Sequence, residues 1–236
     1  MIMERIDKII SEHTPYTRKE IKKLISQKAV YVNGEVVKKP ECKFDETDIS
    51  IRINGEEIEI KKHIFLLLNK PKGYISATES KSHKTVLDLI DKKYRHRNLF
   101  PAGRLDKDTT GLMLITDDGE FSHNILSPRK HVQKEYEVSI DIPVTSEMAE
   151  GFKKGVDLID GECKTADLVI TGEYTANVTI TEGRYHQIKR MFGCFGAKVV
   201  QLNRIRIGNL YLPKELKLGE VKEATKEELQ KIQERN

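Results

Sequence analysis

The sequence predicts an α+β fold, with a small α/β module at the N-terminus and a larger domain after it. Two pairs, Asn33-Gly34 and Asn54-Gly55, each interrupt an alternating apolar stretch and predict tight hairpins. Two apolar runs, "IFLLLNK" at 64–70 and "GLMLIT" at 111–116, predict buried strands. Helix and strand patterns then alternate irregularly and no G-x-G-x-x-G occurs, which excludes a dinucleotide-binding fold.

The chain begins with two amphipathic helical patterns. Residues 3–13 place three isoleucines on one face, and Pro15 ends this element. Thr17 can cap a second helix over residues 18–28, whose apolar residues lie opposite a basic face. That basic face consists of Arg18, Lys19, Lys22 and Lys23. Two helices followed by small strands predict a compact unit.

An acidic segment separates this unit from the rest of the chain. Residues 44–60 contain six acidic residues and one arginine, and we therefore expect a boundary near residue 60, with domains at 1–60 and 61–236. In the larger domain the patterns predict strands at 136–140, 166–170 and 177–181, and helices at 85–90, 145–155, 184–195 and 225–233.

The composition is that of a charge-rich globular protein, with 33% charged and 38% hydrophobic residues. No apolar run approaches the roughly 20 residues of a membrane-spanning helix, and the first residues lack the apolar core of a signal peptide. We therefore expect a cytoplasmic protein without membrane contact. Cys42, Cys163 and Cys194 lie far apart and form no C-x-x-C, which indicates free thiols rather than a zinc site or a disulfide framework.

The positive charge is concentrated in three segments. Residues 1–43 carry a net charge of +4, and residues 61–106 and 183–217 carry +7 each, although the whole chain is only +4. Several basic segments in a nearly balanced chain favour an extended anionic partner such as a nucleic acid over a small metabolite. Lysine-rich surfaces that only face solvent are the alternative, and charge alone does not decide between them.

The stretch "AGRLDKDTTGLMLITDDGE", residues 102–120, combines carboxylates and basic groups around a buried strand. Arg104 and Asp106 lie two residues apart, so in an extended segment their side chains project to the same side. We interpret Asp108 as a residue that caps or orients the loop, and Asp117-Asp118-Gly119 as a turn that ends the strand.

The motifs resemble those of a known family. Residues 3–48 are similar to the alpha-L RNA-binding module, or S4 domain, through "TRKEIKKLI" and the V-x-V-N-G at 30–34. The whole chain resembles pseudouridine synthases of the ribosomal small-subunit group. Four segments in the family order carry this resemblance: "LNKPKGYISAT", "AGRLDKDTTGLMLITDDG", "KEYEV" and "EGRYHQIKRMFGCFGAKVVQLNRIRIG".

The resemblance implies a mainly antiparallel sheet flanked by helices, and it implies conversion of a uridine in ribosomal RNA to pseudouridine. The group's best-known target is uridine 516 of 16S ribosomal RNA. The isomerisation exchanges no group or electron with a third molecule, so we expect neither cofactor nor metal. By the resemblance Asp106 is the catalytic carboxylate, which either attacks C1′ or takes a proton from C2′. Lys189 is the cation partner of Asp106. Tyr136 stacks on the uracil and helps to remove the C5 proton.

The resemblance also implies RNA contacts. Arg104 lies beside the aspartate, where it contacts the RNA backbone or fills the gap left by the flipped nucleotide. Lys70 and Lys72 of "NKPKGY" help to position the RNA. In "RYHQIKRMF", Arg184 and Arg190 contact phosphates, while His186 and Gln187 orient the loop or hydrogen-bond RNA. The basic face of residues 18–28 lies along the RNA backbone. The expected partner of a monomeric enzyme is 16S ribosomal RNA or the assembling small subunit.

Two other readings remain open. In one, the chain is a ribosome-associated RNA-binding protein that has lost activity, although Asp106, Tyr136 and Lys189 are all present. In the other, it modifies 23S ribosomal RNA of the large subunit. Sister groups with that target typically read "NRQVRRM" where residues 185–191 read "YHQIKRM", which favours the small subunit.

Overall fold

The computed structural model describes residues 3–46, 49–127, 130 and 132–234, so Thr47 and Asp48 of the acidic segment lie outside the described residues. The chain forms two compact units, one comprising residues 1–63 and 90–99 and the other residues 64–89 and 100–236. Segment 90–99, which the sequence analysis assigned to the larger domain, is grouped with the first unit. The Arg97 guanidinium donates hydrogen bonds there to the carbonyl oxygens of Glu12, Lys61 and Lys62.

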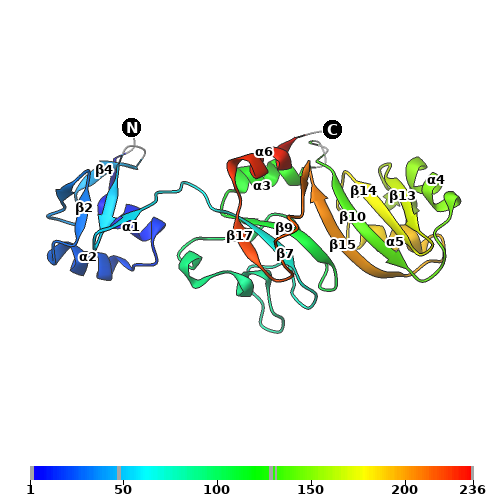
Figure 1. Ribbon diagram of the computed structural model, residues 1–236, viewed down its shortest axis with the longest axis horizontal. Coiled ribbons are helices and arrows are strands. Elements are labelled where there is room, and N and C mark those ends of the chain that lie inside the picture. Colours follow the sequence, from blue (N-terminus) through cyan, green and yellow to red (C-terminus); the bar gives the residue numbers. More distant parts are fainter. Residues whose placement is uncertain (1–2, 47–48, 128–129, 131, 235–236) are drawn as a thin grey trace. The chain divides into compact units, whose positions relative to one another are not determined.

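The first unit packs two helices against short strands around an isoleucine- and valine-rich core. Its elements are β1 (Met3–Arg5), α1 (Ile6–His13), α2 (Arg18–Ser26), β2 (Val30–Val32), β3 (Glu35–Val36), β4 (Lys43–Asp45), β5 (Ile51–Ile53), β6 (Glu56–Ile58) and η3 (Lys92–Tyr94) (Figure 1). The first helix starts later than predicted because Met3–Arg5 pairs with β4 as a strand.

The predicted cap and hairpins of this unit are present. Thr17 and Glu20 form a capping box at the start of α2, in which each side chain accepts a hydrogen bond from the other's backbone N–H. The pairs β2–β3 and β5–β6 are hairpins in a sheet of order β3-β2-β5-β6. Asn33 and Gly34 both have positive φ, at 50° and 83°, as a two-residue hairpin turn requires.

The second unit is built on one large, mainly antiparallel sheet of order β13-β14-β10-β15-β9-β7-β17 (Figure 1). Two short strands join its middle, since β8 pairs with β9 and β16 pairs with β15. The strands are β7 (Phe65–Lys70), β8 (Phe100–Pro101), β9 (Thr110–Thr116), β10 (Lys134–Ile140), β13 (Asp167–Gly172), β14 (Thr175–Ile180), β15 (Val199–Ile207), β16 (Leu210–Tyr211) and β17 (Val221–Glu223). A separate hairpin comprises β11 (Asp157–Leu158) and β12 (Gly161–Glu162).

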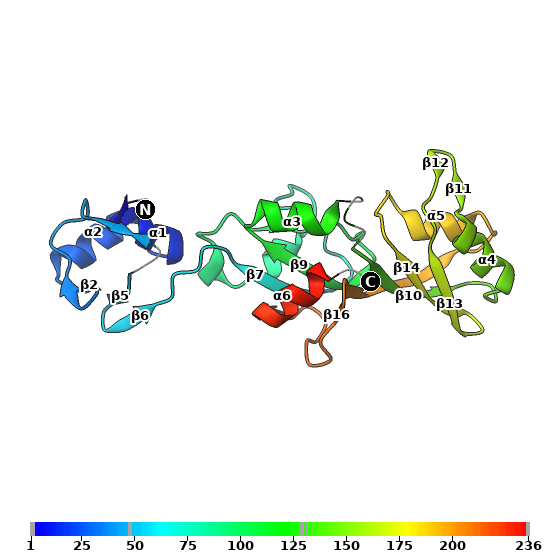
Figure 2. The ribbon, with the colours of Figure 1, turned by 90° about the horizontal axis from the view of Figure 1, so that it is seen from above.

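Helices cover this sheet in two pairs. Figure 2 shows α3 (Gly119–Leu126) and α6 (Lys226–Gln233) near β7 and β9, and α4 (Ser146–Lys154) and α5 (Gln187–Gly193) near β13 and β14. A short 3₁₀ helix, η2 (Val86–Leu89), takes the place of the helix predicted at 85–90. Leu67 of β7 packs with α3 and α6, whereas Leu66 and Leu68, which point the opposite way, are also buried. Residues 64–68 are therefore all apolar because both faces of the strand are covered.

Two long elements were missed from the sequence. The turn predicted at Asp117-Asp118-Gly119 is instead the start of α3, because Asp118 Oδ1 accepts a hydrogen bond from Phe121 N at 2.9 Å. Strand β15 has an irregular pattern of exposed and buried residues, so no strict alternation marks it as a strand.

The two halves of the sheet meet at a short parallel junction between β15 and β9, formed by the pairs Asn203–Thr110 and Arg204–Gly111. Gly111 has a φ of 104°, and a Cβ there would lie 2.2 Å from the carbonyl oxygen of Arg204. Only glycine fits this close approach of two backbones. The loop at 102–109 enters β9 immediately before this junction.

Replacing Gly111 by Ala should therefore lower the free energy of unfolding by about 3 kcal/mol, because the new methyl group clashes with backbone and the φ is strained. Urea unfolding followed by circular dichroism measures this loss. Gly119→Ala is the matched control, since the space around its Cβ position is empty and its φ is not positive. Equal midpoints for the two variants would contradict the close-packed junction.

Candidate active site

A cavity of about 680 Å³ opens where the loop at 102–109 faces the segment before α5. Its volume lies within the range of roughly 300–1,000 Å³ that is usual for small-molecule sites. Tyr136, Lys134 and Arg204 line it and are buried, so they form its floor, whereas Arg104 and Tyr185 line it and are exposed, so they form its rim. The cavity thus brings together residues of β10, β15 and two loops.

Asp106 lies at the centre of a charged cluster on this cavity. Its Oδ2 is 2.9 Å from Lys189 Nζ, and its Oδ1 is 3.4 Å from His186 Nε2. Lys189 also donates to both carboxylate oxygens of Asp108, at 2.7 and 3.0 Å. The ammonium group of Lys189 is therefore shared by two carboxylates, of which Asp106 is three-quarters buried and Asp108 is exposed.

The contact between Lys189 and Asp108 stabilises the charged forms of both groups. Burial acts to lower the pKa of Lys189, but hydrogen bonds to Asp108 and Asp106 outweigh it and raise that pKa above its usual value. The hydrogen bond from Lys189 lowers the pKa of Asp108. Lys189 therefore stays charged and Asp108 stays ionised throughout the neutral range.

Lys70 binds the backbone of the Asp106 loop from the interior of the protein. Its Nζ donates to the carbonyl oxygens of Thr109 at 2.8 Å, Asp106 at 3.0 Å, Pro71 at 3.2 Å and Lys107 at 3.4 Å. The Lys70 side chain is fully buried, and burial lowers its pKa to about 8. The prediction that Lys70 contacts RNA is therefore wrong, because its ammonium group binds the loop from inside the protein.

Two further contacts fix the same loop. Ser76 Oγ donates to the carbonyl oxygen of Leu105 at 2.7 Å and accepts from Leu105 N at 2.9 Å. Gly73 N donates to the carbonyl oxygen of Lys107 at 2.8 Å. Segment "NKPKGYIS" thus holds both sides of Asp106, and this is how it contributes to the site.

Tyr136 is nearly buried, with 7% of its surface exposed, and lies in β10 opposite Arg204 of β15. Residues opposite one another in an antiparallel pair point to the same face, so both side chains reach the cavity floor. Lys134 lies two residues before Tyr136 on that face, and burial lowers its pKa to about 8.

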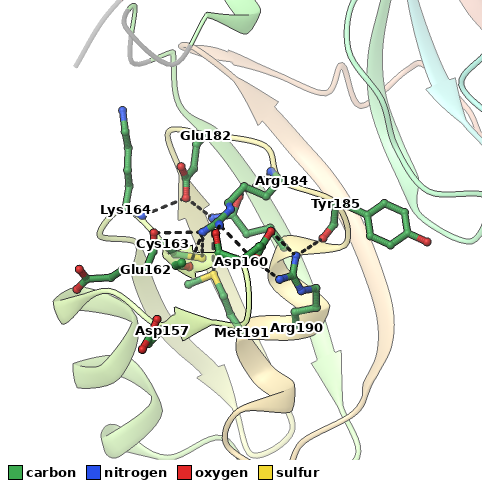
Figure 3. Close-up of polar contacts among 12 residues, drawn as sticks. Asp157, Asp160, Glu162, Cys163, Lys164, Glu182, Arg184, Tyr185, Arg190 and Met191 are labelled. Carbon is green, nitrogen blue, oxygen red and sulfur yellow. Dashed lines mark hydrogen bonds and ion pairs between the residues drawn. The ribbon is translucent and has the colours of Figure 1, made fainter.

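The two arginines of "RYHQIKRMF" are engaged within the protein. Arg184 donates to the carbonyl oxygens of Asp160, Gly161 and Glu162, and Arg190 pairs with the Asp160 carboxylate (Figure 3). Arg184 thus binds the β11–β12 hairpin while 21% of its side chain stays exposed, and its contact with phosphate stays a prediction. Arg190 is about one quarter exposed, and its contact with phosphate stays a prediction.

Gln187 and His186 shape the start of α5. Gln187 is buried, accepts a hydrogen bond from Arg184 N and donates one to Glu182, so it orients the loop, as one of the two predicted roles requires. His186 has left-handed backbone angles, φ 48° and ψ 34°, and its ring stacks on Tyr185 with centroids 3.9 Å apart.

The remaining predicted RNA contacts are exposed. Arg104 lies on the cavity rim, and Lys72 is exposed outside the cavity. Arg18, Lys19, Lys22 and Lys23 are all exposed along α2 in the other unit. These residues remain predictions, because their exposure permits contact with RNA but does not demonstrate it.

Sequence reasoning missed three features of this site. Asp108 was interpreted as a loop residue, whereas its carboxylate binds Lys189; its spacing of two from Asp106 was the available signal. Ser76 and Arg204 were given no role. Arg204 stands next to apolar residues in "NRIRIG", but so does Arg206, and the sequence offers no signal that separates the two.

Among the described residues, no cluster of three or more histidine, cysteine or carboxylate side chains is arranged to hold a metal ion. In the same part of the chain, no helix has the length and apolar character needed to cross a bilayer.

Comparison with known proteins identifies the family of this chain. Residues 64–193 match the RNA pseudouridylate synthase family, and residues 4–49 match the S4 domain. The ribosomal small subunit pseudouridine synthase A of Pasteurella multocida is 42% identical over 95% of this chain and 97% of its own. The protein of the same name from Escherichia coli K12 is 40% identical over 97% and 99%.

A solved structure agrees as well. A crystal structure of a pseudouridylate synthase, 38% identical, superposes with a TM-score of 0.69 over 97% of this chain and 99% of that one. Fold and site thus define an RNA-modifying isomerase. The chain belongs to the RNA pseudouridylate synthase family and carries an S4 domain in front of the synthase domain.

The Lys70 anchor gives a direct test. Lys70→Met should lower the free energy of unfolding by about 3 kcal/mol, because carbonyl oxygens of the Asp106 loop lose their buried donor. Urea unfolding measures this loss. Lys72→Met, two residues away and exposed, should change stability by no more than about 0.5 kcal/mol. A stable Lys70→Met protein would show that this ammonium group does not hold the loop.

Proposed function

We propose that this enzyme converts a uridine of small-subunit ribosomal RNA to pseudouridine, with Asp106 as the catalytic carboxylate. The observation that carries the proposal is the Asp106–Lys189 ion pair of 2.9 Å on a cavity whose floor contains Tyr136. A carboxylate, a cation and an aromatic ring around a cavity of this volume suit a single nucleotide taken out of an RNA helix.

The chemistry needs a carboxylate that is fixed and close to the sugar. The Lys70 and Ser76 contacts hold the backbone on either side of Asp106. Little free energy is therefore needed to orient the carboxylate when RNA binds. It then either attacks C1′ or removes a proton from C2′. Tyr136 offers its ring for stacking on the uracil and its hydroxyl group for removal of the C5 proton.

The exposed cations supply the RNA contacts of the proposal. Arg104 at the rim, Lys72 and the basic face of α2 bind the backbone, and Arg190 exchanges Asp160 for a phosphate. Such contacts give affinity without reading sequence. The names of the curated relatives support a ribosomal small-subunit target, and uridine 516 of 16S ribosomal RNA is the site we propose.

Mapping pseudouridines in ribosomal RNA tests this proposal. Cells lacking the gene should lose one pseudouridine in 16S ribosomal RNA, and the wild-type gene should restore it. Loss at a 23S site would instead identify a large-subunit enzyme, and no loss at all would favour an inactive RNA-binding protein.

A matched pair of variants tests the role of Asp106. Asp106→Asn and Asp108→Asn each remove one carboxylate partner of Lys189, but only the first removes the group proposed to react. Asp106→Asn should lower single-turnover formation of pseudouridine at least about 1,000-fold with little change in RNA affinity, whereas Asp108→Asn should lower it about 10-fold. Equal losses would assign Asp106 no role beyond binding Lys189.

The basic face of α2 predicts a salt dependence. Each phosphate contact contributes about 0.7–0.9 to the slope of log affinity against log salt. The triple variant Lys19→Gln, Lys22→Gln, Lys23→Gln should therefore reduce that slope by about 2–3, with an unchanged turnover rate at saturating RNA.

A control triple variant removes three lysines that are exposed elsewhere: Lys153→Gln, Lys154→Gln, Lys226→Gln. Filter binding across a salt series compares the two. Identical slopes would mean that α2 does not lie on RNA.

A further inference from the structure

Within the described part of the chain, Arg204 carries a buried guanidinium nitrogen without a partner. The residue is 4% exposed, and its Nε donates to the carbonyl oxygen of Leu112 at 2.7 Å. Its Nη2 is buried and has no hydrogen-bond partner among the described residues. Buried polar groups in proteins are nearly always hydrogen-bonded, and a charged group left unpaired is costly. An unpaired donor on the wall of a substrate cavity indicates a partner that the substrate supplies.

A β-bulge explains why Arg204 points to the cavity. In the pairing of β10 with β15, Glu135 lies opposite Arg206 but Tyr136 lies opposite Arg204, so one extra residue, Ile205, is inserted between them. Such a bulge reverses the face to which neighbouring side chains point. Arg204 therefore shares the face of Tyr136, whereas Arg206 shares the other face with Glu135.

Arg206, on the same strand, has hydrogen-bond partners for its guanidinium group and is the comparison for Arg204. Its guanidinium group binds Glu135 at 2.6 Å, the carbonyl oxygen of Gly208 at 2.5 Å and Gln133 at 3.2 Å. Among the described residues no carboxylate pairs with Arg204. The fixed Nε contact holds the Arg204 guanidinium in one place while leaving Nη2 free.

The cavity floor has positive charge without a matching carboxylate. Lys134 and Arg204 are both buried there, and among the described residues Lys134 donates only to the carbonyl oxygen of Ile125. The carboxylates that line the cavity are otherwise engaged: Asp106 and Asp108 bind Lys189, and Glu182 accepts from Lys164 N and Gln187. The floor therefore suits an oxygen that carries or develops negative charge.

We propose that Arg204 is a further catalytic residue, whose Nη2 donates a hydrogen bond to a carbonyl oxygen of the uracil and stabilises the base as an anion. The inference rests on the proposed function. When the N1–C1′ bond breaks, its electron pair stays on the uracil and is shared by N1 and the carbonyl oxygens. After the ring turns, that pair forms the C5–C1′ bond, a proton leaves C5 and a proton is taken up at N1.

The negative charge on the base exists only between these two bond changes. A fixed donor that meets this charge lowers the barrier without tightening the binding of RNA. Arg204 thus acts on the uracil, while Asp106 acts on the sugar.

The test compares two bases as the group that leaves C1′, uracil and 5-fluorouracil. Arg204→Gln is assayed in single turnover with RNA that carries either uridine or 5-fluorouridine at the target, by following cleavage of the N1–C1′ bond. On uridine the rate should fall about 100- to 1,000-fold, with RNA affinity unchanged within about threefold. On 5-fluorouridine, Arg204→Gln should reduce the rate by a factor at least about tenfold smaller than on uridine. Fluorine itself stabilises the uracil anion, so less depends on the arginine.

Two other variants complete the experiment. Arg204→Lys keeps the charge and should retain more activity than Arg204→Gln, with the same dependence on fluorine. Arg206→Gln removes a buried guanidinium from the opposite face and should show equal defects on both RNAs. If Arg204→Gln does not fold, the fluorine dependence of Arg204→Lys decides the question.

A defect of equal size on uridine and 5-fluorouridine, or a normal rate, overturns the role of Arg204. These results differ from failure of the proposed function, which would appear as no pseudouridine made by the wild type or as an active Asp106→Asn enzyme.

Discussion

The buried ammonium group of Lys70 is the interaction on which the site depends. It binds carbonyl oxygens at positions 71, 106, 107 and 109, so one charge ties the end of β7 to the loop that carries Asp106. A hydrogen bond to a charged group is stronger than one between neutral groups, and a buried one is not weakened by solvent. Everything that the loop presents to the cavity, including the contact of Asp106 with Lys189, requires that this backbone stay in place.

The charges around Asp106 form a graded series from solvent to interior. Asp108 is exposed, Lys189 and Asp106 are mostly buried, and Arg204 is buried at the floor. Electrostatic interactions strengthen as solvent is excluded. The cluster therefore combines a surface carboxylate that holds Lys189 with deeper groups whose charges act on whatever enters the cavity.

The sequence predicted the elements that local chemistry determines. Thr17 predicted the cap of α2 and Asn33-Gly34 predicted a hairpin, because each acts on its neighbours in the chain. Asp106, Tyr136 and Lys189 were brought together by resemblance to a family, and the structure places Asp106 and Tyr136 on one cavity with Lys189 bound to Asp106. Lys70 and Lys72 were indistinguishable in the sequence, since burial depends on the path of β9 and its loop. The role of Arg204 depends on a bulge at Ile205, which no spacing of residues reveals.

His186 carries a cost that bears on how such an enzyme adapts to heat. A residue with a side chain in the left-handed region is strained by about 1–3 kcal/mol, whereas glycine adopts these angles freely. Evolution towards thermal stability alone would thus favour glycine at this position. The same replacement would remove the imidazole ring 3.4 Å from Asp106 and its stack with Tyr185. The folded protein is therefore less stable than it would be with glycine at position 186, and in return it keeps an imidazole ring at the mouth of the cavity.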